Sequence, residues 1–189
     1  MTPFGARETS IPGLFVVDMK EIGDDRGVVR EFYRRSDFGN SLPTLGPWVQ
    51  VNLTETRQGA IRGLHGEQTN KFVGVVAGGA LGVYLDARPT SPTYGKVETL
   101  ALHQGVGVLV TTGICNGFQA VASGTTQHLY CFDQEWQPGM AGTSVNPLDR
   151  DLAIRWPIVI DPSDRTLLSE KDAALPCFSE LGLEAETRL

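Results

Sequence analysis

Short runs of alternating apolar and polar residues recur along the chain, with the two-residue period of a β-strand rather than the period of a helix. The runs extend from Leu14 to Met19, Val28 to Arg34, Trp48 to Leu53, Phe72 to Val76, Leu81 to Asp86, Val106 to Val110 and Gln127 to Phe132. Turn-forming stretches such as Gly78-Gly79 and Gln137-Pro138-Gly139 separate them. This pattern predicts an all-β fold, and we expect one antiparallel jelly-roll barrel.

Helical spacing is credible only from Ser36 to Asn40 and around Leu168 to Ala174, so we expect a few short peripheral helices. The chain has 189 residues, which suits one domain with a continuous core, and no repeat or linker divides it. We expect residues 1–189 to form this single domain, with the barrel core at about 12–160. The C-terminal segment 161–189 should pack on the core, and its end, 176–189, should be peripheral.

Residues near the middle of the chain indicate which way one strand faces. Because side chains alternate across a strand, Gly82, Tyr84 and Asp86 share one face, and Leu81, Val83 and Leu85 share the other. A buried carboxylate without partners would cost several kcal/mol, so a polar inner face indicates a ligand cavity. We therefore expect one face of this strand to be core and Asp86 to lie in a polar cavity.

The net charge of −6 and the pI near 5.0 make nucleic acid an improbable partner, because phosphate backbones are bound by clustered positive charge. A small anionic ligand needs only a few local Arg and Lys side chains. We find no signal peptide and no apolar run of about 18 residues, so we expect a cytoplasmic protein with no membrane contact. The three cysteines lack the spacing of a disulfide framework or a zinc ribbon.

Histidine is scarce, which limits metal chemistry. A metal-binding barrel of this type needs about three imidazoles and a carboxylate, usually beginning with His-x-His. Here Gly66 and Glu67 follow His65, and Asn116 stands where a later strand should return a histidine. The chain also lacks Gly-x-Ser-x-Gly, the dinucleotide fingerprint and the phosphate-binding loop. We therefore expect neither a metal nor a cofactor.

Several motifs occur in a fixed order: Arg62-Gly63-Leu64-His65, then Lys71, the segment from Asp86 to Gly95, Tyr130, and Ser169-Glu170-Lys171-Asp172. With Asp25-Arg26-Gly27, Gln50-Val51-Asn52 and the run from Ala153 to Pro157, they cover about 160 residues. The series resembles the dTDP-4-dehydrorhamnose 3,5-epimerase family, whose members have a cupin-type barrel. The resemblance implies a cofactor-free epimerase of a nucleotide-diphosphate 4-keto-6-deoxysugar, and a homodimer with exchanged N-terminal strands.

The resemblance also implies a role for each matching residue. His65 would be the base that removes a proton beside the ketone, and Asp172 would support the imidazolium. Tyr130 would return a proton from the other face. Lys71, together with Arg62, would face the developing oxyanion, and Asp86 would lie behind them. The remaining residues would bind the sugar, phosphates or nucleotide: Arg26, Glu31, Gln50, Asn52, Asn116 and Trp136.

Ordinary explanations compete with these roles. His65 could be a core histidine, Tyr130 a packing residue, Asp172 a helix-starting residue, and Lys71, Arg26 and Glu31 solvated strand charges. Arg62 also raises a geometric difficulty, because a residue three positions from His65 should point to the opposite face of the strand. A bulge at Gly63 could bring both side chains into the cavity.

The chain departs from the family pattern at several positions. Asn116 replaces a second active-site histidine, and Gly66-Glu67 replaces an aromatic residue followed by Gln. Trp136, Val29 and Ala141 replace a common Tyr, Phe and Glu. We therefore expect that one carbon, rather than two, is inverted. The alternative is a ketoisomerase-like or catalytically inactive cupin that binds a nucleotide sugar.

Overall fold

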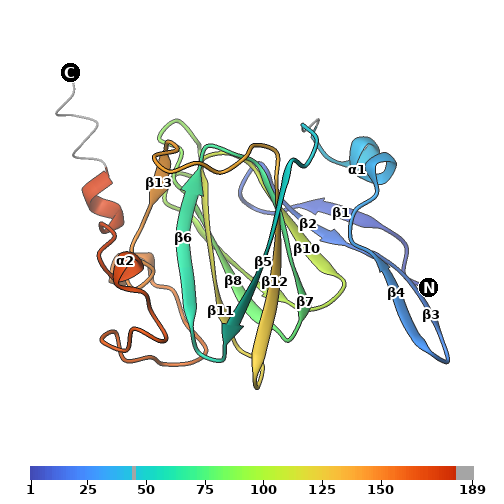
Figure 1. The fold of residues 1–189 in the computed structure, drawn as a ribbon. Coiled ribbons are helices and arrows are strands. Elements are labelled where there is room, and N and C mark those ends of the chain that lie inside the picture. Colours follow the sequence, from blue (N-terminus) through green and yellow to red (C-terminus); the bar gives the residue numbers. More distant parts are fainter. Residues whose placement is uncertain (44–45, 182–189) are drawn as a thin grey trace.

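Two antiparallel sheets face each other and enclose the interior of the protein (Figure 1). The computed structural model describes residues 1–43 and 46–181. One sheet has six strands in the order β1-β2-β10-β7-β12-β5, and the other has five in the order β13-β6-β11-β8-β9. Strands β3 and β4 form a separate hairpin that projects from the barrel (Figure 1). This arrangement confirms the predicted cupin-type jelly-roll fold.

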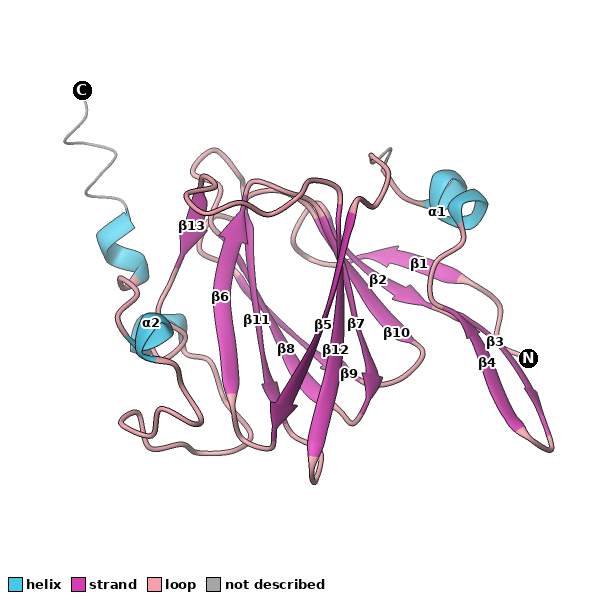
Figure 2. Cartoon of the chain, in the orientation of Figure 1, coloured by secondary structure: helices cyan, strands magenta, loops and turns pink. Residues whose placement is uncertain are grey.

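The strands of the six-stranded sheet are β1 (Gly5–Glu8), β2 (Leu14–Asp18), β10 (Val106–Val110), β7 (Lys71–Ala77), β12 (Thr125–Phe132) and β5 (Gln50–Arg57). Those of the five-stranded sheet are β13 (Gly142–Ser144), β6 (Ile61–Glu67), β11 (Ile114–Ala120), β8 (Ala80–Asp86) and β9 (Val97–Leu102). The hairpin consists of β3 (Lys20–Asp24) and β4 (Gly27–Glu31). Two short labelled helices, α1 (Arg35–Ser41) and α2 (Glu170–Ala173), lie at the periphery (Figure 2). The 3₁₀ turn η1 (Arg150–Leu152) and a helical turn at 178–181 complete the helical elements of the described residues.

Each of the seven predicted alternating runs overlaps a strand, and α1 and α2 overlap the two predicted helices. The run beginning at Val28 ends earlier than predicted, at Glu31, because α1 starts soon afterwards. The alternation did not reveal β1, β3, β6, β9 or β13. It also failed at β11, where every residue from Ile114 to Ala120 is buried and the alternation disappears.

Three apolar clusters hold the layers together. The inner cluster lies between the sheets and includes Leu14, Val73 and Phe118. A second cluster, with Phe38 and Phe72, packs α1 and the N-terminal segment onto the outer face of the six-stranded sheet. In a third cluster, Trp156 and two residues of the C-terminal segment, Phe178 and Leu181, cover the outer face of the five-stranded sheet. The described part of this segment therefore packs on the core, while residues 182–189 of the predicted tail lie outside the described residues.

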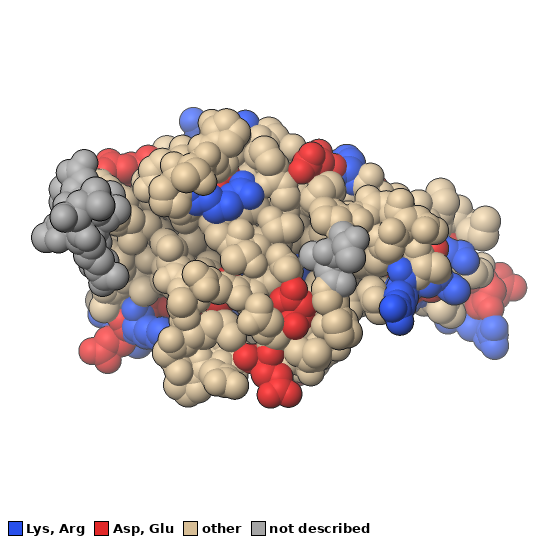
Figure 3. All heavy atoms as spheres, turned by 90° about the horizontal axis from the view of Figure 1, so that it is seen from above, with Lys and Arg blue, Asp and Glu red and all other residues tan. Residues whose placement is uncertain are grey.

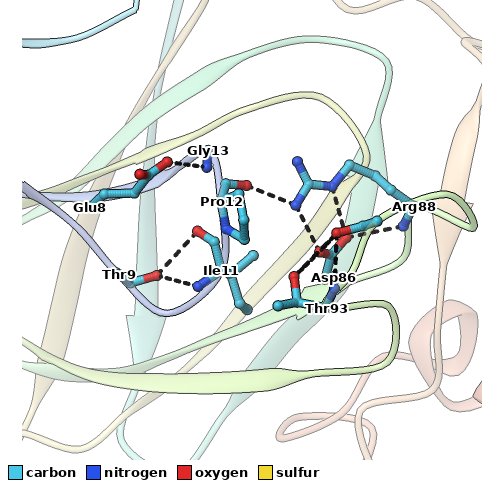
Figure 4. A network of polar contacts seen from close by, with 9 residues as sticks. Glu8, Thr9, Ile11, Pro12, Gly13, Asp86, Arg88 and Thr93 are labelled. Carbon is cyan, nitrogen blue, oxygen red and sulfur yellow. Dashed lines mark hydrogen bonds and ion pairs between the residues drawn. The ribbon is translucent and has the colours of Figure 1, made fainter.

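The prediction that β8 has one core face and one polar, cavity-lining face is wrong. Gly82 and Tyr84 lie on a tightly packed inner face, and the opposite face with Val83 and Leu85 is covered by apolar side chains from 145–156 and 178–181. Asp86 is fully buried at the end of the strand, where it pairs with Arg88 at 2.7 Å and accepts hydrogen bonds from Ser91 and Thr93. Arg88 also donates to the Pro12 carbonyl (Figure 4). Asp86 therefore holds a turn and, through Arg88, the N-terminal segment in place.

We expect Asp86→Asn to destabilise the protein by about 2 kcal/mol or more at neutral pH, because it leaves the Arg88 guanidinium without its ion partner. Burial alone would raise the pKa of Asp86, but the hydrogen bonds from Arg88, Ser91 and Thr93 hold that pKa well below its ordinary value. A lowered folded-state pKa stabilises the protein above the unfolded-state pKa of about 3.9, and this contribution is lost as pH falls. Urea unfolding at pH 7 and near pH 3 would measure it.

The matched control is Asp18→Asn, which removes an exposed ion pair with Arg7 at 3.4 Å. Exposed pairs contribute about 0–1 kcal/mol, so this variant should unfold almost like the parent protein. If Asp86→Asn lowered the free energy of unfolding equally at both pH values, the stabilising ion pair would be contradicted.

None of the helices in the described residues has the length and apolar character needed to span a membrane.

Candidate active site

A pocket of about 210 Å³ opens between the two sheets, and strands from both sheets supply its walls. From the five-stranded sheet, β6 and β11 contribute, and from the six-stranded sheet β5, β7 and β12; α2 contributes Asp172. The lining residues are Asn52, Thr54, Arg62, Gly63, His65, Glu67, Lys71, Asn116, Gly117, Tyr130, Phe132 and Asp172. Most of the polar residues predicted from the sequence therefore converge on one cavity.

His65 and Asp172 form a hydrogen-bonded pair although 107 positions separate them in the chain. Nε2 of His65 lies 2.8 Å from Oδ1 of Asp172, whose side chain is only 8% exposed. The side chain of Ser169 caps α2 by accepting a hydrogen bond from the Asp172 N–H, which fixes the first turn of the helix. Burial tends to raise the pKa of Asp172, but the hydrogen bond and charge of His65 hold it below its ordinary value. Asp172 is therefore an ionised partner for the imidazole.

An irregularity in β6 brings Arg62 and His65 into the same pocket. The pairing of β6 with β11 shifts register between Asn116 and Phe118, opposite Gly63. Gly63 has a φ of +118°, and a Cβ on it would lie 2.5 Å from the Cα of Gly117. Only glycine fits this close approach of two strands. The bulge suggested by the sequence therefore accounts for the position of Arg62, whose Nε donates to the Thr56 hydroxyl at 2.9 Å.

The Lys71 side chain extends from β7 in the six-stranded sheet and contacts three groups of the five-stranded sheet. Its Nζ lies 2.8 Å from Oδ1 of Asn116 and 3.2 Å from the carbonyl oxygen of His65, and it forms an ion pair with the Glu67 carboxylate. The Lys71 side chain is 4% exposed. Burial tends to raise the pKa of Glu67, but the charge and hydrogen bond of Lys71 lower it below its ordinary value. The pocket therefore holds a buried ion pair beside His65.

Tyr130 reaches the pocket from β12, on the wall opposite β6. Burial raises the pKa of its phenol, and the positive charge of Arg62 and a hydrogen bond with Thr54 offset only part of that rise. The Tyr130 ring packs beside His128, with ring centroids 4.5 Å apart, and His128 in turn stacks on Phe118. Tyr130 is consequently a protonated phenol in a fixed orientation at neutral pH.

The structure separates the other predicted binding residues. Asn52 lines the pocket, whereas Gln50 lies outside its lining, donates to Asn52 Oδ1 at 3.1 Å and accepts from the Trp136 backbone N–H at 2.7 Å. Trp136 is outside the lining too and is 45% exposed. Arg26 and Glu31 lie on the projecting hairpin, where they pair with Asp24 and with Arg34 and Lys20. Within one chain, these residues and Asp86 do not contribute to the cavity.

The sequence interpretation missed several lining residues. Thr54 was not identified, although it lies on the same face of β5 as Asn52, two positions later, so the period of the strand could have indicated it. Glu67 lies two positions after His65 on β6, so the same period could have indicated that it lines the pocket. Phe132 follows Tyr130 by the same rule.

The described residues contain no cluster of three or more His, Cys, Asp or Glu side chains able to hold a metal ion. On the face shown in Figure 3, acidic and basic side chains are interspersed, with no large area of one sign. This surface does not resemble the clustered positive charge that binds nucleic acid.

Comparison with known proteins identifies the family. A model of the dTDP-4-dehydrorhamnose 3,5-epimerase family matches residues 8–180. The chain belongs to this family. A dTDP-4-dehydrorhamnose 3,5-epimerase of Streptomyces griseus is 32% identical over 93% of this chain and 87% of its own. A dTDP-4-dehydro-6-deoxyglucose 3-epimerase of Streptomyces bikiniensis is also 32% identical, over 90% of this chain and 87% of its own.

A solved structure agrees with the sequence matches. RmlC of Legionella pneumophila, a dTDP-6-deoxy-D-glucose-3,5-epimerase solved in complex with dTDP-4-keto-L-rhamnose, superposes with a TM-score of 0.86. It is 27% identical, and the match covers 96% of each chain. Relatives that invert two centres and one that inverts a single centre are thus similar to this chain at the same level of identity. Membership of the epimerase family makes this protein a carbohydrate epimerase and leaves the number of inverted carbons open.

Proposed function

We propose that this protein epimerises a nucleotide-diphosphate 4-keto-6-deoxysugar of the dTDP-4-keto-6-deoxyglucose type, without a cofactor. The observation that carries the proposal is the position of His65 and Tyr130 on opposite walls of one pocket. A base on one side of a sugar ring and an acid on the other are the two groups that inversion beside a ketone requires. The family's substrates supply the ketone and the nucleotide. The cytoplasmic location stays a prediction from the sequence.

His65 is proposed as the base. Because Nε2 of His65 forms a hydrogen bond with the Asp172 carboxylate, Nδ1 is the ring nitrogen left to accept a proton. The ketone at carbon 4 acidifies the neighbouring C–H bond. As the proton moves to Nδ1, the C–H electron pair forms the carbon–carbon double bond, and the carbonyl electrons move to oxygen. Asp172 stabilises the imidazolium that results.

Tyr130 is proposed as the acid that completes inversion. Its raised pKa keeps the proton on the phenol until the enolate forms. When the enolate collapses, the carbon takes the phenolic proton on the face opposite His65, and the carbonyl is restored. Release of the His65 proton to solvent and reprotonation of Tyr130 return the enzyme to its starting state.

We propose that only one of the two acidic carbons is inverted. The support is Asn116, which stands at the position of a second histidine in the family motif and lies in the pocket lining. An amide cannot exchange protons at neutral pH as an imidazole does, so one proton-transferring group is lost.

We further propose a homodimer in which exchanged N-terminal strands complete each site. Arg26 and Glu31 lie on the projecting hairpin, whose apolar side chains Val28 and Val29 are 48% and 68% exposed. A partner chain would cover those side chains and receive the charged residues near its nucleotide. The size of the protein in solution would test this, because a monomer has a mass of 20.5 kDa.

We expect the purified protein to convert dTDP-4-keto-6-deoxyglucose in deuterated water into a product labelled and inverted at carbon 3 or carbon 5. Nuclear magnetic resonance reports both the label and the configuration. The same incubation with GDP- and CDP-linked sugars would identify the nucleotide preference. Binding without any label would favour the alternative, a catalytically inactive sugar-binding cupin, and a moved carbonyl would favour a ketoisomerase.

A further inference from the structure

The three N–H donors of the Lys71 ammonium are all engaged. An ammonium has three donors and no acceptor. Those of Lys71 go to the Asn116 amide oxygen, the His65 carbonyl oxygen and the Glu67 carboxylate. With a side chain that is 4% exposed, Lys71 could contact a sugar oxygen only by giving up one of these partners. Its expected role as the group facing the oxyanion therefore conflicts with its contacts.

The contact with Lys71 fixes the orientation of the Asn116 amide. Because an ammonium can only donate, the atom of Asn116 that lies 2.8 Å from Nζ must be oxygen. The Nδ2 amino group therefore points away from Lys71. In the part of the chain that the structure describes, this amino group makes no hydrogen bond, and Asn116 lines the pocket.

Asn116 is also placed beside the base. On the neighbouring strands β6 and β11, Asn116 and His65 are direct partners in the register. Side chains that face each other across such a pair have Cβ atoms about 4.5–5.5 Å apart, so both can reach neighbouring atoms of one ligand. A charge-assisted hydrogen bond to the amide oxygen also polarises the amide and strengthens its N–H donors.

We propose that the Nδ2 amino group of Asn116, rather than the Lys71 ammonium, donates the hydrogen bond that stabilises the enolate oxygen. Lys71 and Glu67 are then positioning residues: Lys71 holds the amide oxygen, and Glu67 balances the buried charge of Lys71. Asn116 transfers no proton, and its N–H group donates a hydrogen bond to the negatively charged oxygen. This inference rests on the proposed epimerase function, and it gives Glu67 a role as the charge partner of Lys71.

The test compares solvent-deuterium exchange into dTDP-4-keto-6-deoxyglucose for the parent protein and for Asn116→Ala. Loss of one donor to an oxyanion typically lowers kcat by about 100-fold to 1,000-fold. We expect that loss, with KM changed by less than about 3-fold, because the bond strengthens only as the enolate forms. Asn116→Ser, whose side chain is shorter, should show the same loss of kcat. The exposed Asn40 supplies the control, and Asn40→Ala should leave both constants unchanged.

If Lys71 were the donor, Asn116→Ala would free one of its N–H groups, and kcat would stay within about 5-fold of the parent value. That result would overturn the inference alone. A parent protein that exchanges no label into any 4-keto sugar would overturn the proposed function and this inference together. Melting temperature and dTDP binding would verify that each variant is folded.

A double-mutant cycle tests the positioning role of Lys71. Lys71→Met is combined with Glu67→Gln, so that no buried charge is left unpaired. In the parent background we expect kcat to fall by about 10-fold, because the amide is no longer held. In the Asn116→Ala background the same two substitutions should change kcat by less than about 3-fold, since the amide that Lys71 positions is then absent. A further loss of about 30-fold there would show direct action by Lys71 and overturn the assignment.

Discussion

His65→Ala is expected to lower solvent-deuterium exchange into the 4-keto sugar by at least about 100-fold, because loss of a general base typically costs 100-fold to 10,000-fold. The imidazole is held by Asp172 at 2.8 Å, and Nδ1 of His65 is the nitrogen proposed to take the proton. Exchange would be followed by nuclear magnetic resonance at saturating substrate, so that weaker binding does not imitate a slower chemical step.

His103→Ala provides the matched control for this substitution. His103 is an exposed histidine outside the pocket lining, so its removal should leave the rate of exchange unchanged. If the His65 variant retained a tenth or more of the parent rate while His103→Ala was unaffected, another group would have to be the base. Among the described residues, the carboxylates that line the pocket and could replace His65 as the base are Asp172 and Glu67.

Tyr130→Phe is expected to separate exchange from inversion. The substitution keeps the ring and its packing against His128, with centroids 4.5 Å apart, and removes only the acidic proton. His65 could still remove a proton and return deuterium to the same face. Inversion should slow by about 100-fold, the typical value for a lost general acid, while labelled substrate of unchanged configuration accumulates.

Tyr94→Phe is the control, because Tyr94 is 40% exposed and packs on Phe178 away from the pocket. Both exchange and inversion should be unchanged in that variant. Melting curves of the two tyrosine variants would show whether either substitution disturbs the fold. Normal inversion by Tyr130→Phe would remove this phenol from the mechanism and leave water or another residue as the acid.

The sequence predicted seven strands from the two-residue period of their side chains. β5 shows this period in its burial, because residues 51, 53, 55 and 57 on one face are exposed while Thr56 on the other face is buried. β11 does not, since its two faces are both buried. The family motifs gave the positions of His65, Tyr130 and Asp172, which the structure brings to one pocket.

The sequence alone determined the all-β class, the family and most of the residues around the pocket, because strand period and ordered motifs are local properties of the chain. Only the tertiary structure decided what those residues touch. Asp86 lies on the predicted strand, yet its partners come from the following turn, and the burial of both strand faces cannot be known from one strand. Lys71 and Asn116 are 45 positions apart, and their contact exists only because two sheets close around one cavity. A hydrogen bond depends on the direction of each donor, and three-dimensional packing sets that direction.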